Sequence, residues 1–582
     1  MSAWVLGCVL AAASLQPPQV SPRRDTPAAS TPTGTAVVSG MVTTDAEKPV
    51  PLRRARVVLS NSDIRYSRTI VTDDTGRFTF RNVPAGRFTL SAVKEAFVNA
   101  AYGARRPGGT GAPLTIADGG EVTGLVLKLQ RGGVITGVII DAASQPVPDA
   151  QVGAFQYMFV NGERRLVSRQ SGRSDDRGVY RIFGLSAGQY IVSASMSRTS
   201  FGATSDILLP SDADVDRALK EPATGSQSIG VGRPAGYVPV YHPATTSVAQ
   251  ASQVEVAAGA ERSGIDIQLL MVPSGRVEGT VTYPDGELPR NLQLSMTAAG
   301  DDGLRGIDGF RMGRPEANGR FQFGGLPPAD YLVTARANLP GGGPNAVLWA
   351  TANVTVSGDG IVQVPLELRR GFTVTGRVQF DATKAPPTDM RGWRVGLGPV
   401  LGRNEVSLGV NDADVQPDGT FTLTGVPSGR FRVRPMPPSP LADHWQPRSI
   451  AADGRNLLDE PIDVLSDIQG MTVVFTDRIP TLSGRLQDVS GAAPSDYHVI
   501  LFPAERALWV PQSPRIHAIR VGTDGHYTFK RVLPGSYFLA ITLDVEPGEW
   551  MDPSFLQRLS PTAMPIALAE GEQKLQDLRV SK

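Results

Sequence analysis

Residues 73–90 read "DDTGRFTFRNVPAGRFTL", and this arrangement decides the fold because it returns four more times along the chain. A turn glycine is followed by Phe78 and Phe80, and a Pro-x-Gly turn is followed by Phe88. Side chains alternate along a strand, so Phe78 and Phe80 face the same side of a sheet. Proline and glycine supply the backbone angles of a tight turn. The stretch therefore predicts a β-hairpin.

Five copies of this pattern divide the chain into units of similar length. The other copies are "DDRGVYRIFGLSAGQYIV" (175–192), "EANGRFQFGGLPPADYLV" (316–333), "QPDGTFTLTGVPSGRFRV" (416–433) and "GTDGHYTFKRVLPGSYFL" (522–539). Each unit opens on a strand with a central glycine, namely Gly40, Gly137, Gly279, Gly376 and Gly484. Each also ends on a strand, such as "GLVLKL" in the first unit. Units of about 100 residues built from short strands are typical of immunoglobulin-like sandwiches.

The fold class expected from these repeats is all-β, with about five tandem immunoglobulin-like or prealbumin-like β-sandwiches. Gly and Pro together make up 110 residues (63 plus 47), which suits many turns better than helices. Short linkers such as "RGGV" and "RRGF" favour stiff end-to-end packing, so we expect an elongated rod.

The expected domain boundaries follow the repeats. They are a signal peptide at 1–20, a linker at 21–35, and sandwiches at 36–131, 132–272, 273–371, 372–478 and 479–582. The second sandwich carries a long insertion at about 195–250, which we expect to be a partner-binding loop because long loops on rigid scaffolds often carry function. The alternative is an insertion without a binding role.

The N-terminal segment indicates export. Residues 3–13 form an apolar run followed by small residues, as in a signal peptide, although no charged residue precedes the run. An unstructured apolar terminus is the alternative. Cys8 is the sole cysteine, and it is either lipidated or removed with the leader. We find no other apolar stretch long enough for a spanning helix. The expected location is extracytoplasmic, in the periplasm, at the outer-membrane surface or secreted.

The second copy carries a family resemblance. Its matching residues are Gly137, Pro146, Ala150, Val152, Asp175, Gly178, Tyr180, Gly188 and Tyr190. These resemble the carboxypeptidase regulatory-like domain, and the first copy fits nearly as well. The other three keep the turn pattern but lack the P-x-x-x-A-x-V segment. The resemblance implies a transthyretin-like, carbohydrate-binding-like sandwich that serves as an accessory domain without catalytic residues and is common in bacterial surface proteins.

Catalytic chemistry finds no support in the sequence. "GLSAG" around Ser186 satisfies G-x-S-x-G, but Ser186 occupies the turn position that Ala85, Pro328, Ser428 and Pro534 hold in the other copies. A nucleophile elbow joins a strand to a helix, whereas this serine joins two strands. None of the five histidines has a glutamate three residues on. We therefore expect no enzyme, metal or cofactor.

Two acidic clusters are candidate calcium sites. They comprise Asp212, Asp214 and Asp216 in one segment and Asp412, Asp414 and Asp418 in another. Neither has EF-hand spacing with a closing glutamate, so solvated turns are the better interpretation. The formal net charge of +1 gives no field that would attract nucleic acid.

Three tryptophans are candidates for stacking on a ligand. Trp445, Trp509 and Trp550 lie in irregular segments of the last two units. Sugar-binding surfaces use exposed aromatic faces, while the alternative is that each indole covers a core edge.

The function expected from the sequence is a non-catalytic, extracytoplasmic, multi-domain binding or scaffold protein. The alternatives are a carbohydrate-binding protein, or an accessory subunit of a surface enzyme or outer-membrane complex. The expected partner is a polysaccharide or a cell-surface protein.

Overall fold

The computed structural model describes residues 33–196, 207–209, 216, 233–298, 310–339, 346–358, 360–400, 410–491, 494, 496–543 and 545–580. The expected signal peptide with Cys8, most of the linker and much of the insertion lie outside the described residues. Strands dominate what is described, and tandem β-sandwiches are present as the repeats predict.

The first two sandwiches each contain two sheets. Sandwich 1 comprises β1 (Ala36–Thr44), β2 (Arg56–Asn61), β3 (Tyr66–Val71), β4 (Arg77–Val83), β5 (Gly86–Val93), β6 (Ala100–Ala101), β7 (Leu114–Ile116) and β8 (Glu121–Leu129). Sandwich 2 comprises β9 (Gly133–Ile140), β10 (Ala150–Val160), β11 (Glu163–Arg173), β12 (Val179–Leu185), β13 (Gly188–Met196), β16 (Val240–Tyr241), β17 (Val254–Val256), β18 (Glu261–Arg262) and β19 (Ile267–Gln268). The 3-10 helix η1 (Val248–Gln250) lies between β16 and β17.

A small sheet joins sandwich 2 to sandwich 3. It contains β14 (Ile207–Leu209), β15 (Arg233–Tyr237) and β20 (Met271–Pro273), in the order β14-β15-β20. The first two strands come from the long insertion, and β20 leads directly into sandwich 3. The base of the insertion is therefore part of a domain junction.

Sandwiches 3, 4 and 5 repeat the two-sheet arrangement. Sandwich 3 comprises β21 (Gly275–Thr282), β22 (Gln293–Ala298), β23 (Phe310–Gly313), β24 (Arg320–Leu326), β25 (Ala329–Asn338), β26 (Val347–Val356), β27 (Ile361–Glu367) and β28 (Arg369–Arg370). Sandwich 4 comprises β29 (Phe372–Phe380), β30 (Arg394–Pro399), β31 (Ala413–Asp414), β32 (Thr420–Val426), β33 (Gly429–Met436), η3 (Ser439–Leu441), β34 (Gln446–Ala452), β35 (Arg455–Asn456), β36 (Ile462–Val464) and β37 (Ile468–Thr476). Sandwich 5 comprises β38 (Thr481–Gln487), β39 (Tyr497–Pro503), η4 (Arg506–Leu508), β40 (His517–Arg520), β41 (His526–Phe529), β42 (Gly535–Leu543), η5 (Glu549–Met551), α2 (Pro553–Leu559), η6 (Ser560–Thr562), β43 (Met564–Leu568), β44 (Gln573–Leu575) and β45 (Leu578–Arg579).

The opening strand of every sandwich is central in its sheet. In sandwich 1, β1 pairs antiparallel with β4 and parallel with β8. In sandwich 3, β21 pairs in the same way with β24 and β27. The central glycine lies on this strand, where it packs against the parallel strand. A methyl group at Gly279 would overlap the carbonyl oxygen of Val364 and lie 2.7 Å from the Phe321 ring. The glycine is therefore required by a close approach of backbone and aromatic ring.

The predicted hairpin is wrong in every copy. The strands on either side of the Pro-x-Gly turn, β4 and β5 in sandwich 1, belong to different sheets and do not pair. Only Pro84 and Ala85 separate them, so the chain crosses at once from one sheet to the other. Two-residue hairpins need glycine or asparagine in primed turns, which Pro-Ala does not provide. The apolar residues of both strands face a shared interior, but from opposite sheets.

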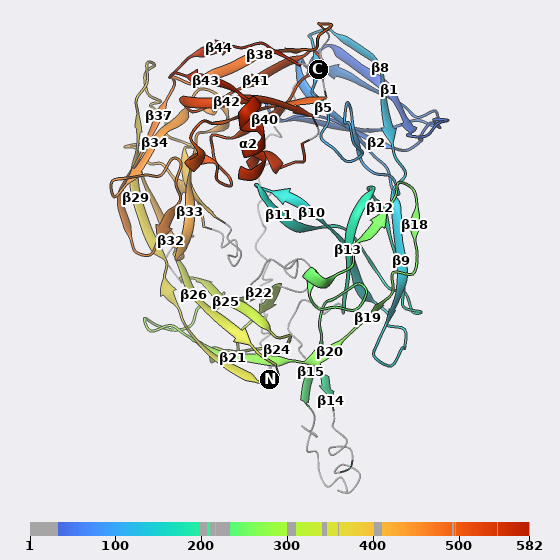
Figure 1. Cartoon of the computed structure of the whole chain (residues 1–582). Coiled ribbons are helices and arrows are strands. Elements are labelled where there is room, and N and C mark those ends of the chain that lie inside the picture. The colour runs from blue at the N-terminus through green and yellow to red at the C-terminus, as the bar shows by residue number, and fades with distance from the viewer. Residues whose placement is uncertain are drawn as a thin grey trace, which may run out of the picture.

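The sandwiches form a closed ring (Figure 1). The expected rod is therefore corrected, since sandwich 5 returns to contact sandwich 1. The Thr115 hydroxyl donates to Asp524 Oδ2 at 3.0 Å, and the Thr523 N–H donates to the Pro113 carbonyl at 3.3 Å. The junctions between sandwiches are short, yet the sandwiches close into a ring, so short linkers alone do not produce a straight array.

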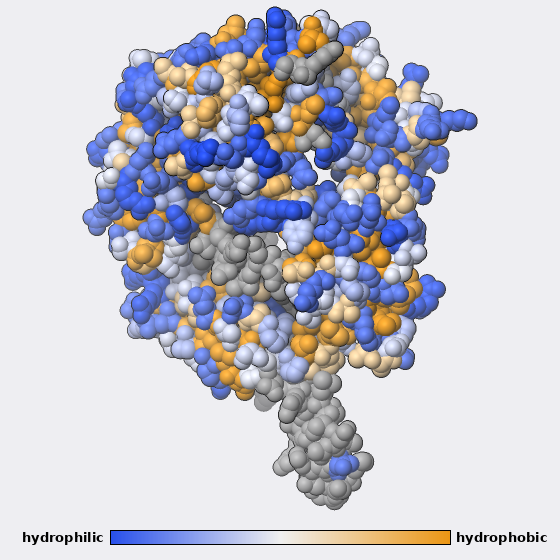
Figure 2. Space-filling view, viewed as in Figure 1, coloured by the Kyte–Doolittle hydropathy of each residue, from blue (hydrophilic) through white to orange (hydrophobic). Residues whose placement is uncertain are grey.

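The hairpin β10–β11 extends across the middle of the ring toward sandwich 5 (Figure 1). At its tip, a methyl group at Gly162 would overlap the carbonyl group of Met551, and one at Gly548 would lie 2.8 Å from the carbonyl oxygen of Phe159. Backbone thus packs directly on backbone here. Hydrophilic side chains cover the strip that this hairpin occupies (Figure 2).

Candidate functional site

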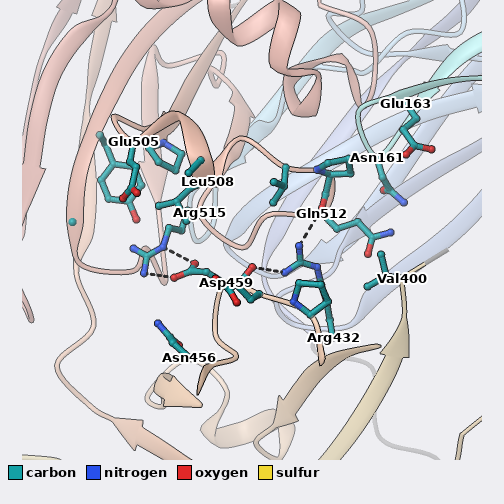
Figure 3. A pocket seen from close by; sticks show the side chains of 18 of the residues that line it. Asn161, Glu163, Val400, Arg432, Asn456, Asp459, Glu505, Leu508, Gln512 and Arg515 are labelled. Atoms are coloured by element: carbon teal, nitrogen blue, oxygen red, sulfur yellow. Dashed lines mark hydrogen bonds and ion pairs between the residues drawn. The ribbon is translucent and has the colours of Figure 1, made fainter. Parts of the chain in front are cut away.

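A cavity of about 1140 Å³ lies where sandwiches 2, 4 and 5 meet. Its walls come from the tip of the β10–β11 hairpin, from β33 and the segment before β36, and from the η4 region and the start of β42 (Figure 3). Small-molecule pockets are commonly about 300–1,000 Å³, so this space is large enough for an extended ligand. It is the candidate functional site.

A buried ion pair organises the boundary between sandwiches 4 and 5 in this cavity. The Arg515 guanidinium donates from Nε to Asp459 Oδ1 at 2.7 Å and from Nη2 to Oδ2 at 2.9 Å. The side chains are only 15% and 12% exposed. Burial acts to lower the pKa of Arg515, but the hydrogen bonds and charge of Asp459 outweigh it and the net shift is upward. The pair fixes the angle between the two sandwiches at the wall of the site.

Arg432 forms a second link across the same boundary. Its Nη1 donates to the Asp459 carbonyl oxygen at 2.9 Å, and its Nη2 donates to the Pro511 carbonyl oxygen at 3.4 Å (Figure 3). Its Nε is buried without a hydrogen-bond partner. Burial lowers the pKa of Arg432, and the charge of Asp459 partly opposes this. The half-buried guanidinium lines the cavity and places a positive charge on its wall.

The remaining lining combines polar and apolar groups. The amides are Asn161, Asn456 and Gln512, and the aliphatic residues are Val160, Val400, Leu508 and Val510. Four arginines and four carboxylates line the space, so its formal charge is balanced. The lining therefore offers hydrogen bonds and apolar contact without favouring either sign of charge.

Four partly exposed charges form a third link between sandwiches 4 and 5. Arg478 contacts Asp381 at 2.9 Å and Glu570 at 3.1 Å. Arg448 contacts Glu570 at 2.8 Å and also pairs with Asp381. Each cation thus bridges both carboxylates, and such networks hold geometry better than isolated surface pairs.

Ser186 lies in the tight crossing between β12 and β13. Its Oγ is 3.0 Å from the Tyr190 hydroxyl, which itself donates to the Ser186 carbonyl oxygen at 2.7 Å. Tyr331 and Tyr537 make the same bond to the carbonyl four residues back, at 2.9 Å and 2.6 Å. The serine is therefore a turn residue, and the hydrogen bond that recurs in three of the five copies is made by the tyrosine twelve positions after the turn glycine.

Two of the three candidate tryptophans are buried, whereas stacking on a ligand requires an exposed ring face. Trp445 is 4% exposed and packs edge-to-face on Phe380 in the core of sandwich 4. Trp509 is 5% exposed and its Nε1 donates to the Pro503 carbonyl oxygen at 2.7 Å. The stacking interpretation is corrected for these two residues, because neither indole has an exposed face. Trp550 is partly buried against the second cluster of sandwich 5, and its role as a ligand contact stays a prediction.

The acidic segment 412–418 has structural roles. Asp412 lies 3.7 Å from Arg434 and 3.9 Å from Arg394. Asp418 accepts from the Thr420 backbone N–H at 3.0 Å, which fixes the turn before β32. Asp212 and Asp214 lie outside the described residues. Within the ranges that the structure describes, no three His, Cys, Asp or Glu side chains are placed to hold a metal ion.

A buried histidine predicts an acid dependence of stability. Burial lowers the pKa of His517 from 6.5 to about 4, and its Nε2 has no hydrogen-bond partner. The unfolded chain binds this proton near pH 6.5, whereas the folded chain does not bind it until about pH 4. Stability should therefore be complete above pH 6.5 and should fall by up to about 3 kcal/mol as the pH approaches 4.

The measurement is the denaturant midpoint of sandwich 5 between pH 7 and pH 4.5. His517→Leu should flatten this profile, because it removes the titrating ring. An identical slope in the two proteins would show that other groups control the acid response.

No motif in the sequence indicates the cavity directly. Arg430 and Arg432 alternate with Phe431 in β33, so both arginines face away from the core, and this was the available signal. Their counterpart Asp459 lies in an irregular segment between β35 and β36, where no periodicity marks it.

Among the residues that the structure describes, we find no helix that combines the length and apolar character needed to span a bilayer.

Residues 37–124 match the family model of the carboxypeptidase regulatory-like domain. The matched range covers most of sandwich 1, which is the part of the chain that is similar to this family. No curated protein matches the chain.

Solved structures show likeness in fold alone. The TIE protein of Bacillus anthracis is 12% identical, over 76% of this chain and 68% of that chain, with a TM-score of 0.14. A minor pilin of Streptococcus agalactiae is 14% identical, over 41% and 97%, with a TM-score of 0.21. A putative carbohydrate binding protein from Pseudomonas aeruginosa is 19% identical, over 16% and 89%, with a TM-score of 0.14.

Proposed function

We propose that the chain is a non-catalytic, extracytoplasmic binding protein in which the ring of sandwiches is a scaffold for one ligand site, the cavity between sandwiches 2, 4 and 5. The observation that carries this proposal is the cavity itself, because its lining comes from three separate sandwiches. Domains that acted only as spacers would not need to bring residues from three sandwiches to one cavity.

The polar groups of the cavity support binding rather than catalysis. Arg515 and Asp459 satisfy each other, and Arg432 is held by backbone carbonyl oxygens. A general base or nucleophile needs a partner within hydrogen-bond reach and a poised pKa. The described lining contains no histidine, serine–histidine pair or cysteine to fill those roles.

The extracytoplasmic location rests on the sequence. The apolar run at 3–13 resembles a leader, and no cysteine follows Cys8. Beyond Cys8 the chain has no thiol, so it would form no disulfide bond in an oxidising compartment.

Array binding with a cavity-filling variant tests the proposal. Purified protein is applied to a glycan array and a peptide array, and each hit is repeated with Ala507→Trp, which places an indole at an exposed position of the cavity wall. Ala142→Trp is the matched control, since Ala142 is exposed on a loop outside the cavity.

We expect a hit that Ala507→Trp weakens at least about tenfold, equivalent to about 1.4 kcal/mol, while Ala142→Trp leaves it unchanged. Binding that both variants retain would place the ligand elsewhere. A peptide hit would identify a protein partner, and a glycan hit would favour the carbohydrate-binding alternative.

A further inference from the structure

The contact that closes the ring is a small polar interface between sandwiches 1 and 5. Arg520 lies at its centre with a side chain that is 5% exposed. The guanidinium donates to the backbone carbonyl oxygens of Gly103 and Thr110 in sandwich 1 and lies 3.6 Å from Asp496 in its own sandwich. Burial of a charge is unfavourable unless hydrogen bonds satisfy it. Two of the hydrogen-bond acceptors of Arg520 therefore come from sandwich 1.

The rest of this interface is also polar. Thr115 bonds to Asp524, Thr523 bonds to the Pro113 carbonyl, and Lys530 lies 3.9 Å from Asp63. The buried apolar clusters of sandwiches 1 and 5 remain separate. A typical hydrogen bond contributes about 0.5–1.5 kcal/mol, so such a contact is reversible. It persists because both surfaces belong to one chain and meet at a high effective concentration.

The walls of the cavity come from both sides of this closing contact. Asn161 and Glu163 come from the hairpin of sandwich 2, which follows sandwich 1 in the chain, whereas Arg432 and Arg515 come from sandwiches 4 and 5. Figure 1 shows the β10–β11 hairpin entering the middle of the ring from the right, while sandwich 4 lies at the left and sandwich 5 at the top. Separating sandwich 5 from sandwich 1 also separates the hairpin tip from the 548–551 segment, and the cavity then loses one wall.

We infer that the interface centred on Arg520 is a reversible latch, and that closing the latch assembles the ligand cavity. The coupling of latch closure to ligand binding rests on the proposed function. A ligand that contacts the hairpin and sandwiches 4 and 5 together binds the closed ring better than the open one, so ligand binding and latch closure favour each other.

The test measures closure directly and needs no ligand. In a Cys8→Ser chain, Ser62→Cys and Arg531→Cys carry a donor and an acceptor dye beside Asp63 and Lys530, which lie across the closure. The closed ring gives high energy transfer between them. Thr115→Glu places a carboxylate opposite Asp524, and Thr115→Ser is the matched control because it keeps the hydroxyl.

We expect Thr115→Glu to raise the ratio of open to closed rings at least about tenfold, equivalent to about 1.4 kcal/mol, with no change for Thr115→Ser. Arg520→Ala should act in the same direction. Hydrogen exchange should accelerate at the tip of β10–β11 in both opening variants, while β4 and β41 stay protected, which separates opening from unfolding.

Equal energy transfer in wild type, Thr115→Glu and Arg520→Ala would overturn the latch, as would low transfer in the wild type. A concentration-dependent dimer with high intermolecular transfer would assign the same surfaces to two chains and would also overturn it. If the latch opens as expected but no array ligand responds to Ala507→Trp, the proposed function fails while the latch stands.

Discussion

Replacing Gly279 by alanine should unfold sandwich 3 under conditions in which the other sandwiches remain folded. The added methyl group would overlap the Val364 carbonyl oxygen on the parallel strand β27 and press on the Phe321 ring. Backbone on a paired strand has little room to move, so β21 must shift away from β27. We expect a loss of at least about 3 kcal/mol, at the upper end for overpacked sites. Peptide-resolved hydrogen exchange should show lost protection in β21, β24 and β27.

Gly360→Ala is the control within the same sandwich. No atom lies within 4 Å of the position that its methyl group would occupy, and its backbone is not left-handed. A surface change of this kind is usually within about 0.5 kcal/mol. Equal destabilisation by both substitutions would mean that the loss of glycine, rather than the close approach at Gly279, controls stability.

Arg515→Ala should produce the second large effect, at the boundary between sandwiches 4 and 5. The substitution leaves the carboxylate of Asp459 buried without its bidentate partner. Breaking one side of a buried ion pair typically costs about 3–5 kcal/mol. Unfolding in guanidinium chloride, followed by the fluorescence of buried Trp509, should shift to lower denaturant concentration.

Two further variants identify the cause. Arg515→Leu combined with Asp459→Leu should recover much of the loss, because apolar replacement of both partners removes the unpaired charge. Arg391→Ala should leave unfolding unchanged, since Arg391 and Asp389 form a bidentate pair with side chains 91% and 56% exposed. A double variant as unstable as Arg515→Ala would show that the pair itself, rather than the orphaned carboxylate, is responsible.

The sandwich fold could be predicted because its determinants are local and repeated. Phe78 and Phe80 mark a strand with one buried face, and Gly40 marks the central strand on which that aromatic face packs. The hairpin error has an equally local origin. Alternation identifies the buried face of a strand but not which sheet contains it, and the signal against a hairpin was the Pro84-Ala85 pair, which does not suit a primed two-residue turn.

The ring and the cavity could not be predicted for a different reason. Arg520 and Gly103 are far apart in the sequence, and a guanidinium that bonds to backbone carbonyls leaves no trace in the side chains of its partner segment. Arg515 and Asp459 are complementary, but many arginines and aspartates in this chain form exposed pairs. Only the angles between sandwiches decide which of them meet, and those angles arise from contacts such as Trp349 Nε1 with the Gly425 carbonyl, 2.8 Å apart.

The parallel pairing of first and last strands sets the order of events during synthesis. In sandwich 3, Arg276 is paired with Ile361. The sheet around the central strand is therefore complete only after the last strand of the same unit has been synthesised. Contacts of such long sequence separation slow folding and leave strand edges unpaired until they form. Each unit therefore matures as a whole, one after another from the N-terminus, and the ring closes only after the fifth unit emerges.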